Sequence, residues 1–267
     1  MHIQSPQYGL ALANELVAEG RLTFTFGDVE KRLGKSKTAT ANLLKRMEKA
    51  GLIDRVRRGH YAVRQLGMLG TPAAAEDIAL TVGAALKGVP HRIAYRSALY
   101  EHDLVVHPAR TIQVATPRRV RTKRLSGRPL RIVIEPPEKL DVGRVPWGTS
   151  YLSDRHRAVL DAAQRPALVG GLEAMAEAFA TAAPELRAHI LLDYARQLGW
   201  ATALRRLGSL ADALALEPLR SALTPIKPIT ADLDLEPGID ERTVWRDKVW
   251  RVRWPRTVDE ILAAIGQ

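Results

Sequence analysis

Apolar and polar positions in the first 67 residues follow the periods of three helices and two strands. In "PQYGLALANELVAEG", the residues Leu10, Leu12, Leu16 and Val17 recur at helical spacing, and Gly20 ends the segment. This pattern predicts a first helix that buries one face.

A second helix is predicted by "TFGDVEKRLG", in which Phe26, Val29 and Leu33 share one face and Gly34 ends the helix. The next letters, Gly-Lys-Ser, resemble the end of a phosphate-binding loop. Such a loop needs a glycine five positions before Gly34, where this chain has Val29, and it needs a preceding strand. The sequence therefore argues against nucleotide binding here.

The stretch "GKSKTATANLLKRMEKAGL", residues 34–52, predicts a third helix that starts at the N-cap Ser36 and runs to Ala50. At about 100° per residue, two sets of side chains separate on its surface. The side that we expect to face inward holds Ala39, Leu43, Met47 and Ala50. The opposite side holds Thr38, Ala41, Asn42, Lys45 and Lys49.

Two short strands, 52–56 and 60–63, follow around a tight "RRG" turn. Three helices followed by a basic two-stranded ribbon predict a winged helix-turn-helix over residues 1–67. In this class the second helix of the turn enters the major groove of DNA. Residues 1–70 hold twelve Lys/Arg against six Asp/Glu, which is +6 of the formal net charge of +11. A surplus of this kind favours polyanionic partners.

The predicted DNA-binding residues divide by chemistry. Long cations suit phosphates, which position the protein without reading sequence; these are Lys35, Lys37, Arg57, Arg58 and Arg64. Side chains able to pair with base edges are Thr38, Asn42 and Lys45. The full predicted set is Lys35, Ser36, Lys37, Thr38, Ala41, Asn42, Lys45, Lys49, Arg55, Arg57, Arg58, His60 and Arg64. The alternative is an ordinary solvated surface, and for His60 the choice is between a minor groove and a hairpin cap.

The rest of the chain predicts an α+β protein with a larger, mostly helical second domain that carries a small β-sheet. The turn-rich stretch 66–77 marks the boundary, so the second domain spans 71–267. It divides into a β-containing part at 88–140, a helical part at 150–222 and an extended tail at 223–267. Individual expectations are a helix over "HRIAYRSALYEHDL", strands at 111–116 and 130–135, an N-cap at Ser153, and one strand in "TVWRDKVWRVRWP" with packed tryptophans.

A second basic segment lies between the two predicted strands. Residues 104–134 contain no acidic residue, and a run of cations falls within them: Arg118, Arg119, Arg121, Lys123, Arg124, Arg128 and Arg131. Such a hairpin is a second nucleic-acid contact, a docking face for an acidic partner, or a solvated loop. The sequence leaves these three open.

Composition narrows the class of protein further. The chain has no Cys, no apolar run of about 18 residues and no secretory pattern at its start, so we expect a cytoplasmic protein without a membrane span. The stretch "EHDLVVH" places Glu101, His102, Asp103 and His107 close together but has no further ligand signal beside it, no nucleophile motif is present, and Pro136 and Pro137 interrupt the one nuclease-like stretch, "IVIEPPEK". We therefore expect no enzyme activity, no metal site and no cofactor.

The chain resembles the AbiEi-type antitoxins of bacterial toxin–antitoxin and abortive-infection systems. The resemblance is carried by "TATANLLKRMEKAGLIDRVRRGHYAV", by "YRSALYEHDL" leading to "TIQVATPRR", and by "DRHRAVLDAAQRPALVGGLEAM". In the last stretch Arg157, Asp161, Pro166, Gly170 and Gly171 match the family pattern, whereas Ala158 stands where the family often has Thr.

The resemblance implies two activities. The winged helix would bind inverted repeats in the promoter of its own operon, and the C-terminal domain would protect against a nucleotidyltransferase-like toxin encoded beside it. Two other classes stay open: a ligand-responsive winged-helix transcription factor, and a nucleic-acid enzyme with a winged-helix targeting module.

Overall fold

The protein has an α+β fold, described here by a computed structural model over residues 5–64, 78–237 and 243–265. Two compact units are distinguished. The first comprises Met1–Pro90, Val120–Arg131 and Pro146–Tyr151, and the second comprises the remaining segments. The predicted boundary at 66–77 lies outside the described residues and stays a prediction.

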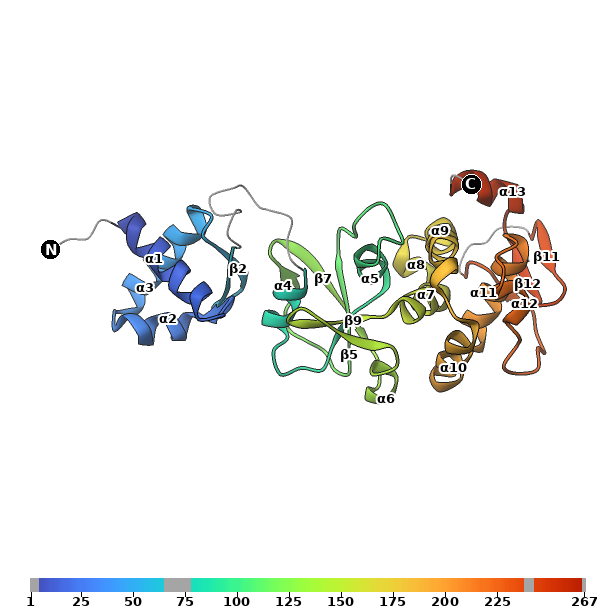
Figure 1. The fold of residues 1–267 in the computed structure, drawn as a ribbon, viewed down its shortest axis with the longest axis horizontal. Coiled ribbons are helices and arrows are strands. Elements are labelled where there is room, and N and C mark those ends of the chain that lie inside the picture. The colour runs from blue at the N-terminus through green and yellow to red at the C-terminus, as the bar shows by residue number, and fades with distance from the viewer. Residues whose placement is uncertain (1–4, 65–77, 238–242, 266–267) are drawn as a thin grey trace. The chain divides into compact units, whose positions relative to one another are not determined.

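The first unit opens with the predicted winged helix-turn-helix (Figure 1). Its elements are α1 (Ser5–Ala18), β1 (Thr23–Thr25), α2 (Phe26–Leu33), α3 (Lys37–Lys49), β2 (Ile53–Arg57) and β3 (His60–Val63). The antiparallel sheet has the order β1-β3-β2. Strand β1 was not predicted, because three residues are too short to show a period.

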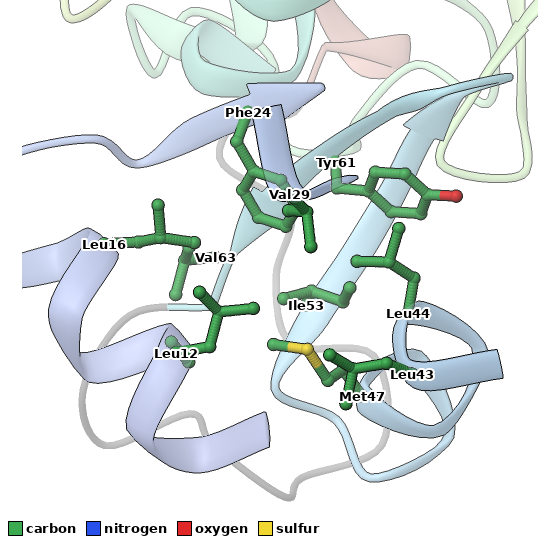
Figure 2. Packing of buried hydrophobic residues seen from close by; sticks show 11 residues of the cluster. Leu12, Leu16, Phe24, Val29, Leu43, Leu44, Met47, Ile53, Tyr61 and Val63 are labelled. Carbon is green, nitrogen blue, oxygen red and sulfur yellow. The ribbon is translucent and has the colours of Figure 1, made fainter. Parts of the chain in front are cut away.

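One apolar cluster holds these elements together, and Figure 2 shows its side chains converging from the three helices and the sheet. Its buried members are Leu12, Ala13, Leu16, Phe24, Val29, Leu43, Leu44, Met47, Ile53, Tyr61 and Val63. The rings of Phe24 and Tyr61 stack with centroids 5.6 Å apart, which joins β1 to β3. Each buried aliphatic side chain contributes about 1.5–3 kcal/mol, so this cluster fixes where α3 lies.

The first unit continues beyond the winged helix. Helix α4 (Ile78–Ala85) has nearly all of its side chains buried, and it contacts β1, β2 and β3. It also contacts β6 (Arg124–Leu125), the first strand of a hairpin completed by β7 (Arg128–Ile134). Removal of residues 1–67 would therefore expose an apolar helix that the winged helix covers.

A six-stranded sheet has the order β6-β7-β5-β4-β9-β8. Its further elements are β4 (Arg92–Ile93), α5 (Tyr95–Glu101), β5 (Ile112–Thr116), α6 (Pro137–Leu140), β8 (Arg144–Trp147) and β9 (Ser150–Ser153). The expected single helix over "HRIAYRSALYEHDL" is wrong in its first part, because Ile93 pairs with Val114 of β5 and with Leu152 of β9. Strands β8 and β9 were not predicted.

Helices follow the sheet as expected: α7 (Arg155–Gln164), α8 (Pro166–Val169), α9 (Leu172–Ala182), α10 (Ala188–Leu198), α11 (Ala201–Ala213) and α12 (Leu219–Ala222). The N-cap of α7 is Asp154, not Ser153: its Oδ1 accepts a hydrogen bond from the backbone N–H of Arg157 at 2.7 Å. Ser153 instead lies buried at the end of β9, where its Oγ donates to the carbonyl of Ile93.

Four fully buried charged groups bind one another inside the second unit. Arg92 of β4 donates to Asp161 at 2.6 Å and to Glu135 at 2.8 Å, and Arg157 donates to the same two carboxylates at 2.8 and 2.9 Å. Arg157 donates two more hydrogen bonds to backbone carbonyls, that of Lys139 in α6 and that of Val142 just after it. Burial opposes ionisation of Asp161, yet the two guanidinium groups hold its pKa below the ordinary value.

The predicted single strand near the C-terminus is two strands joined by a turn. The tail comprises β10 (Leu233–Asp234), β11 (Trp245–Asp247), β12 (Val252–Trp254) and α13 (Val258–Ala264). Trp250 and Trp254 are buried as expected, and Trp254 donates its indole N–H to Ser209 of α11. Trp245 is half exposed and meets Trp254 edge to face at 5.1 Å.

Loss of one buried cation tests the ion network. Arg157→Met should lower the free energy of unfolding by about 3–5 kcal/mol, because Glu135 and Asp161 then keep charges that only Arg92 compensates. Arg196→Met, on the exposed face of α10, is the matched control and should cost under about 0.5 kcal/mol. Urea denaturation of the full chain measures both; equal costs would show that the network is not what holds these elements.

A glycine pair tests the packing of the tail on α11. A Cβ at Gly208 would lie 2.2 Å from the ring of Trp250, so Gly208→Ala should destabilise the protein by about 1–3 kcal/mol. Gly27→Ala in α2 meets nothing closer than 3.8 Å and should be neutral or stabilising by up to about 1 kcal/mol. Thermal denaturation measures whether each variant is more or less stable than the natural protein. A stabilised Gly208→Ala variant would contradict this packing.

Candidate nucleic-acid interface

The turn between α2 and α3 fixes the start of the helix that we expect to contact DNA. α2 ends at Gly34, whose φ of 59° is left-handed and favours glycine. Ser36 then caps α3 as predicted, because its Oγ accepts a hydrogen bond from the backbone N–H of Ala39 at 3.3 Å. Thr25 and Asp28 form a capping box at the start of α2.

The inward face of α3 differs in part from the predicted one. Its buried residues are Thr40, Leu43, Leu44 and Met47. Ala50 was expected to face inward, but it is the C-cap and is exposed; Ala39 is only partly buried. Thr40 and Leu44 take these places, which shifts the buried face toward β2 and the sheet without turning the opposite face.

The outward face of α3 is exposed as predicted. The residues on it are Thr38, Ala41, Asn42, Lys45 and Lys49. Lys35 and Lys37 are also exposed, at the N-terminal end of the same helix. The small side chain of Ala41 leaves the helix surface low between Asn42 and Lys45, which suits close approach to a groove. This face is thus open to a partner, as a helix that reads base edges requires.

The wing consists of β2, β3 and the turn between them. Gly59 has a φ of 76°, and its carbonyl accepts a hydrogen bond from Phe26, which fastens the turn to the start of α2. Arg55 and Arg58 are exposed on this hairpin. The side chain of Arg57 lies outside what the structure describes, so its predicted phosphate contact stays a prediction.

Two other predicted wing residues make contacts within the hairpin. The guanidinium of Arg64 binds both carboxylate oxygens of Asp54, at 3.0 and 2.8 Å, and its side chain is only 10% exposed. It is therefore the weakest of the predicted phosphate ligands. The Nδ1 atom of His60 lies 3.4 Å from the carbonyl of Arg58, which supports the hairpin-cap interpretation over a minor-groove contact.

A hollow of about 490 Å³ lies between α3 and the wing. It is lined by Phe26, Ala41, Lys45, Glu48, Arg55, Arg58, Gly59 and Tyr61. Lys45, Arg55 and Arg58 make its rim cationic, whereas Glu48 is its one carboxylate. Burial raises the pKa of Tyr61, so its hydroxyl stays protonated at neutral pH and can donate a hydrogen bond. Three cations against one carboxylate give the lining of the hollow a positive formal charge.

Sequence reasoning missed the apolar and acidic members of this hollow. Lys45 and Glu48 are three residues apart on a helix, which places both on one side of it. This spacing is the signal from which Glu48 could have been predicted to lie beside Lys45. Phe26 and Tyr61 join them only through the packing of α2 on the hairpin, which no local pattern indicates.

The second basic segment is exposed along most of its length. Exposed cations there are Arg118, Arg119, Arg121, Lys123, Arg124 and Arg131, and Arg128 is partly buried. Arg124 donates to the carbonyl of Gly127 across the turn. The other five exposed cations form no ion pair with any carboxylate in the described residues, so their charge is available to a partner.

The acidic residues considered for catalysis do not form an open site. Asp161 is fully buried in the ion network, where it binds both Arg92 and Arg157, and Glu135 is buried beside it. Within the described ranges no three His, Asp or Glu side chains lie close enough to hold a metal ion. Among the same residues, no helix combines the length and apolar character needed to cross a membrane.

Three helices, a three-stranded sheet and an exposed polar α3 define the N-terminal part as a winged helix-turn-helix. A family model described as "Transcriptional regulator, AbiEi antitoxin" matches residues 12–64. The resemblance to AbiEi antitoxins predicted from the sequence is confirmed over this segment. It indicates a DNA-binding transcriptional regulator.

The fold of the whole chain has a solved counterpart. The crystal structure of the RV2827C protein from Mycobacterium tuberculosis matches with a TM-score of 0.71 and 15% identity, covering 100% of this chain and 97% of that chain. At this identity the match shows a common fold and no more. No curated protein matches the sequence.

Substitutions on α3 and on the wing should separate base reading from phosphate binding. Two DNA duplexes are compared: the sequence upstream of the protein's own gene, and the same bases in scrambled order. Asn42→Ala and Lys45→Ala should each weaken binding to the upstream duplex by about 1–3 kcal/mol more than binding to the scrambled duplex. Arg58→Gln, on the exposed wing, should weaken binding to the two duplexes by equal amounts, because a phosphate contact carries no sequence information. Fluorescence anisotropy titrations measure all three; equal losses on both duplexes for Asn42→Ala and Lys45→Ala would contradict base reading.

Proposed function

We propose that this protein represses the operon that encodes it by binding inverted repeats in its promoter through α3 and the wing. The observation that carries the proposal is the exposed face of α3, from Thr38 to Lys49, in a segment that matches the AbiEi regulator family. Asn42 and Lys45 read bases in the major groove. Lys35, Lys37 and Arg58 bind phosphates beside it.

The second half of the proposal is antitoxin activity. The segments outside the winged helix, residues 71–267, protect the cell from a nucleotidyltransferase-like toxin encoded in the same operon. The family match at residues 12–64 supports an antitoxin, and the resemblance of "DRHRAVLDAAQRPALVGGLEAM" extends this to the helical part. The protein acts in the cytoplasm, where its promoter and the toxin's substrates are found, and it needs neither a cofactor nor a catalytic centre.

Separation of the two activities is best tested in the full chain. Deletion of residues 1–67 would uncover α4, so loss of function in that deletion could reflect misfolding. The double variant Asn42→Ala/Lys45→Ala changes only exposed side chains of α3.

In cells carrying the operon with a promoter reporter, the double variant should release repression at least tenfold, on the order of two lost base contacts. The same variant should still restore growth when the toxin is expressed. Arg196→Gln, on α10, is the matched control and should keep both activities. Loss of protection by a double variant with an unchanged thermal midpoint would rule out the division of labour, and an unchanged reporter would rule out repression through α3.

A further inference from the structure

The β6–β7 hairpin is a rigid element and not a loose loop. Leu125 pairs with Arg128 across a two-residue turn, and both central residues, Ser126 and Gly127, have positive φ values of 44° and 80°. This geometry matches the tight turn whose twist suits two antiparallel strands. Leu125 is fully buried and anchors the hairpin, which carries Arg131 in β7 and directly follows Arg121 and Lys123 along the chain.

The position of β6 brings this hairpin next to the wing. β6 contacts β2, the first strand of the wing, and both belong to the first compact unit. β6 also contacts α4, whose buried side chains join it to the winged-helix sheet. The wing and residues 120–131 therefore belong to the same compact unit as α3.

Three cations of this segment have no carboxylate partner in the described residues. Arg121, Lys123 and Arg131 are exposed and form no ion pair with any carboxylate that the structure describes. The nearest acidic residues along the chain, at 103 and 135, lie outside the stretch that forms the hairpin. Like charges at this density repel one another in the free protein, and a polyanion relieves that repulsion while releasing its own counterions.

The exposed chemistry favours phosphate over a protein partner. The cores of protein–protein interfaces are enriched in aromatic residues and methionine and depleted of charged residues. Ile134, at the end of β7 away from the turn, is exposed, but over residues 118–131, which hold the cations, no large hydrophobic side chain is exposed. A surface of guanidinium and ammonium groups without an apolar centre is suited to a nucleic-acid backbone.

We propose that the β6–β7 hairpin is a second phosphate-binding element, which contacts the backbone of the same duplex DNA that α3 reads, on the flank of the wing. This inference rests on the proposed function of α3. Arg121, Lys123 and Arg131 add affinity and salt dependence, and they add no preference for sequence.

The test is the salt dependence of DNA binding by the full chain. Anisotropy titrations on the upstream duplex between about 50 and about 200 mM salt give the slope of log K against log salt, which falls by about 0.9 for each lost phosphate contact. The triple variant Arg121→Gln/Lys123→Gln/Arg131→Gln should reduce this slope by about 2.7, and its affinity should fall equally on the upstream and the scrambled duplex.

The matched control removes the same charge from exposed positions of the second unit: Arg196→Gln/Lys227→Gln/Lys248→Gln should leave the slope as in the natural protein. A triple hairpin variant with the slope of this control would overturn the hairpin proposal while leaving α3 as the reader. Full DNA binding by the hairpin variant with lost protection from the toxin would also overturn it, in favour of a toxin-docking face. Failure of the natural protein to prefer its upstream duplex would overturn the function proposed for α3 instead.

Discussion

The second unit depends on a set of four buried charges that neutralise one another. Arg92 comes from β4, Glu135 follows β7, and Arg157 and Asp161 lie one turn apart on α7. Such a group is stable only when every member is paired, because one missing partner leaves a charge in a medium of low dielectric constant. The network therefore fixes the end of β7 against the sheet and α7 in a single register.

The winged helix uses apolar packing for the same purpose. Leu43, Leu44 and Met47 bury one face of α3 against α1 and the sheet, and the caps at Ser36 and Ala50 set its length. Once these residues are packed in the core, the side chains on the opposite face of α3 are directed toward solvent. Exposure of Asn42 and Lys45 is thus a consequence of the core, and a rigid core is what a helix needs in order to present side chains to base edges with fixed geometry.

The sequence was sufficient for the parts whose signal is local. The end of α2 at Gly34, the cap of α3 at Ser36 and the outward face of α3 follow from local signals, and the tight turn of the wing follows from Gly59. Features set by distant partners were not predictable. Strand β1 shows no period in three residues and is defined by pairing with β3. Asp161, four residues after Arg157, has the spacing of an exposed helical ion pair, and only Arg92 and Glu135, 69 and 26 positions away, make it a buried one. Likewise the hollow beside α3 needs Tyr61 from a different strand.

The distribution of paired and unpaired cations connects the structure to its partner. In the C-terminal tail, Arg251 binds Asp232, Arg253 binds Asp234 and Arg256 binds Glu173, at distances of 2.7–2.9 Å. The hydrogen bond from Arg251 lowers the pKa of Asp232 and keeps that carboxylate charged. The tail is as arginine-rich as the hairpin, yet its charge is cancelled within the fold. Exposed cations without a carboxylate partner in the described residues include Lys45 and Lys49 on α3, Arg58 on the wing, and Arg121, Lys123 and Arg131 on the hairpin segment. Net charge alone would not have shown this, because a surplus of +11 is compatible with charges scattered over the whole surface. Cations gathered without carboxylate partners on α3, the wing and the hairpin segment have the charge that a line of phosphates would neutralise.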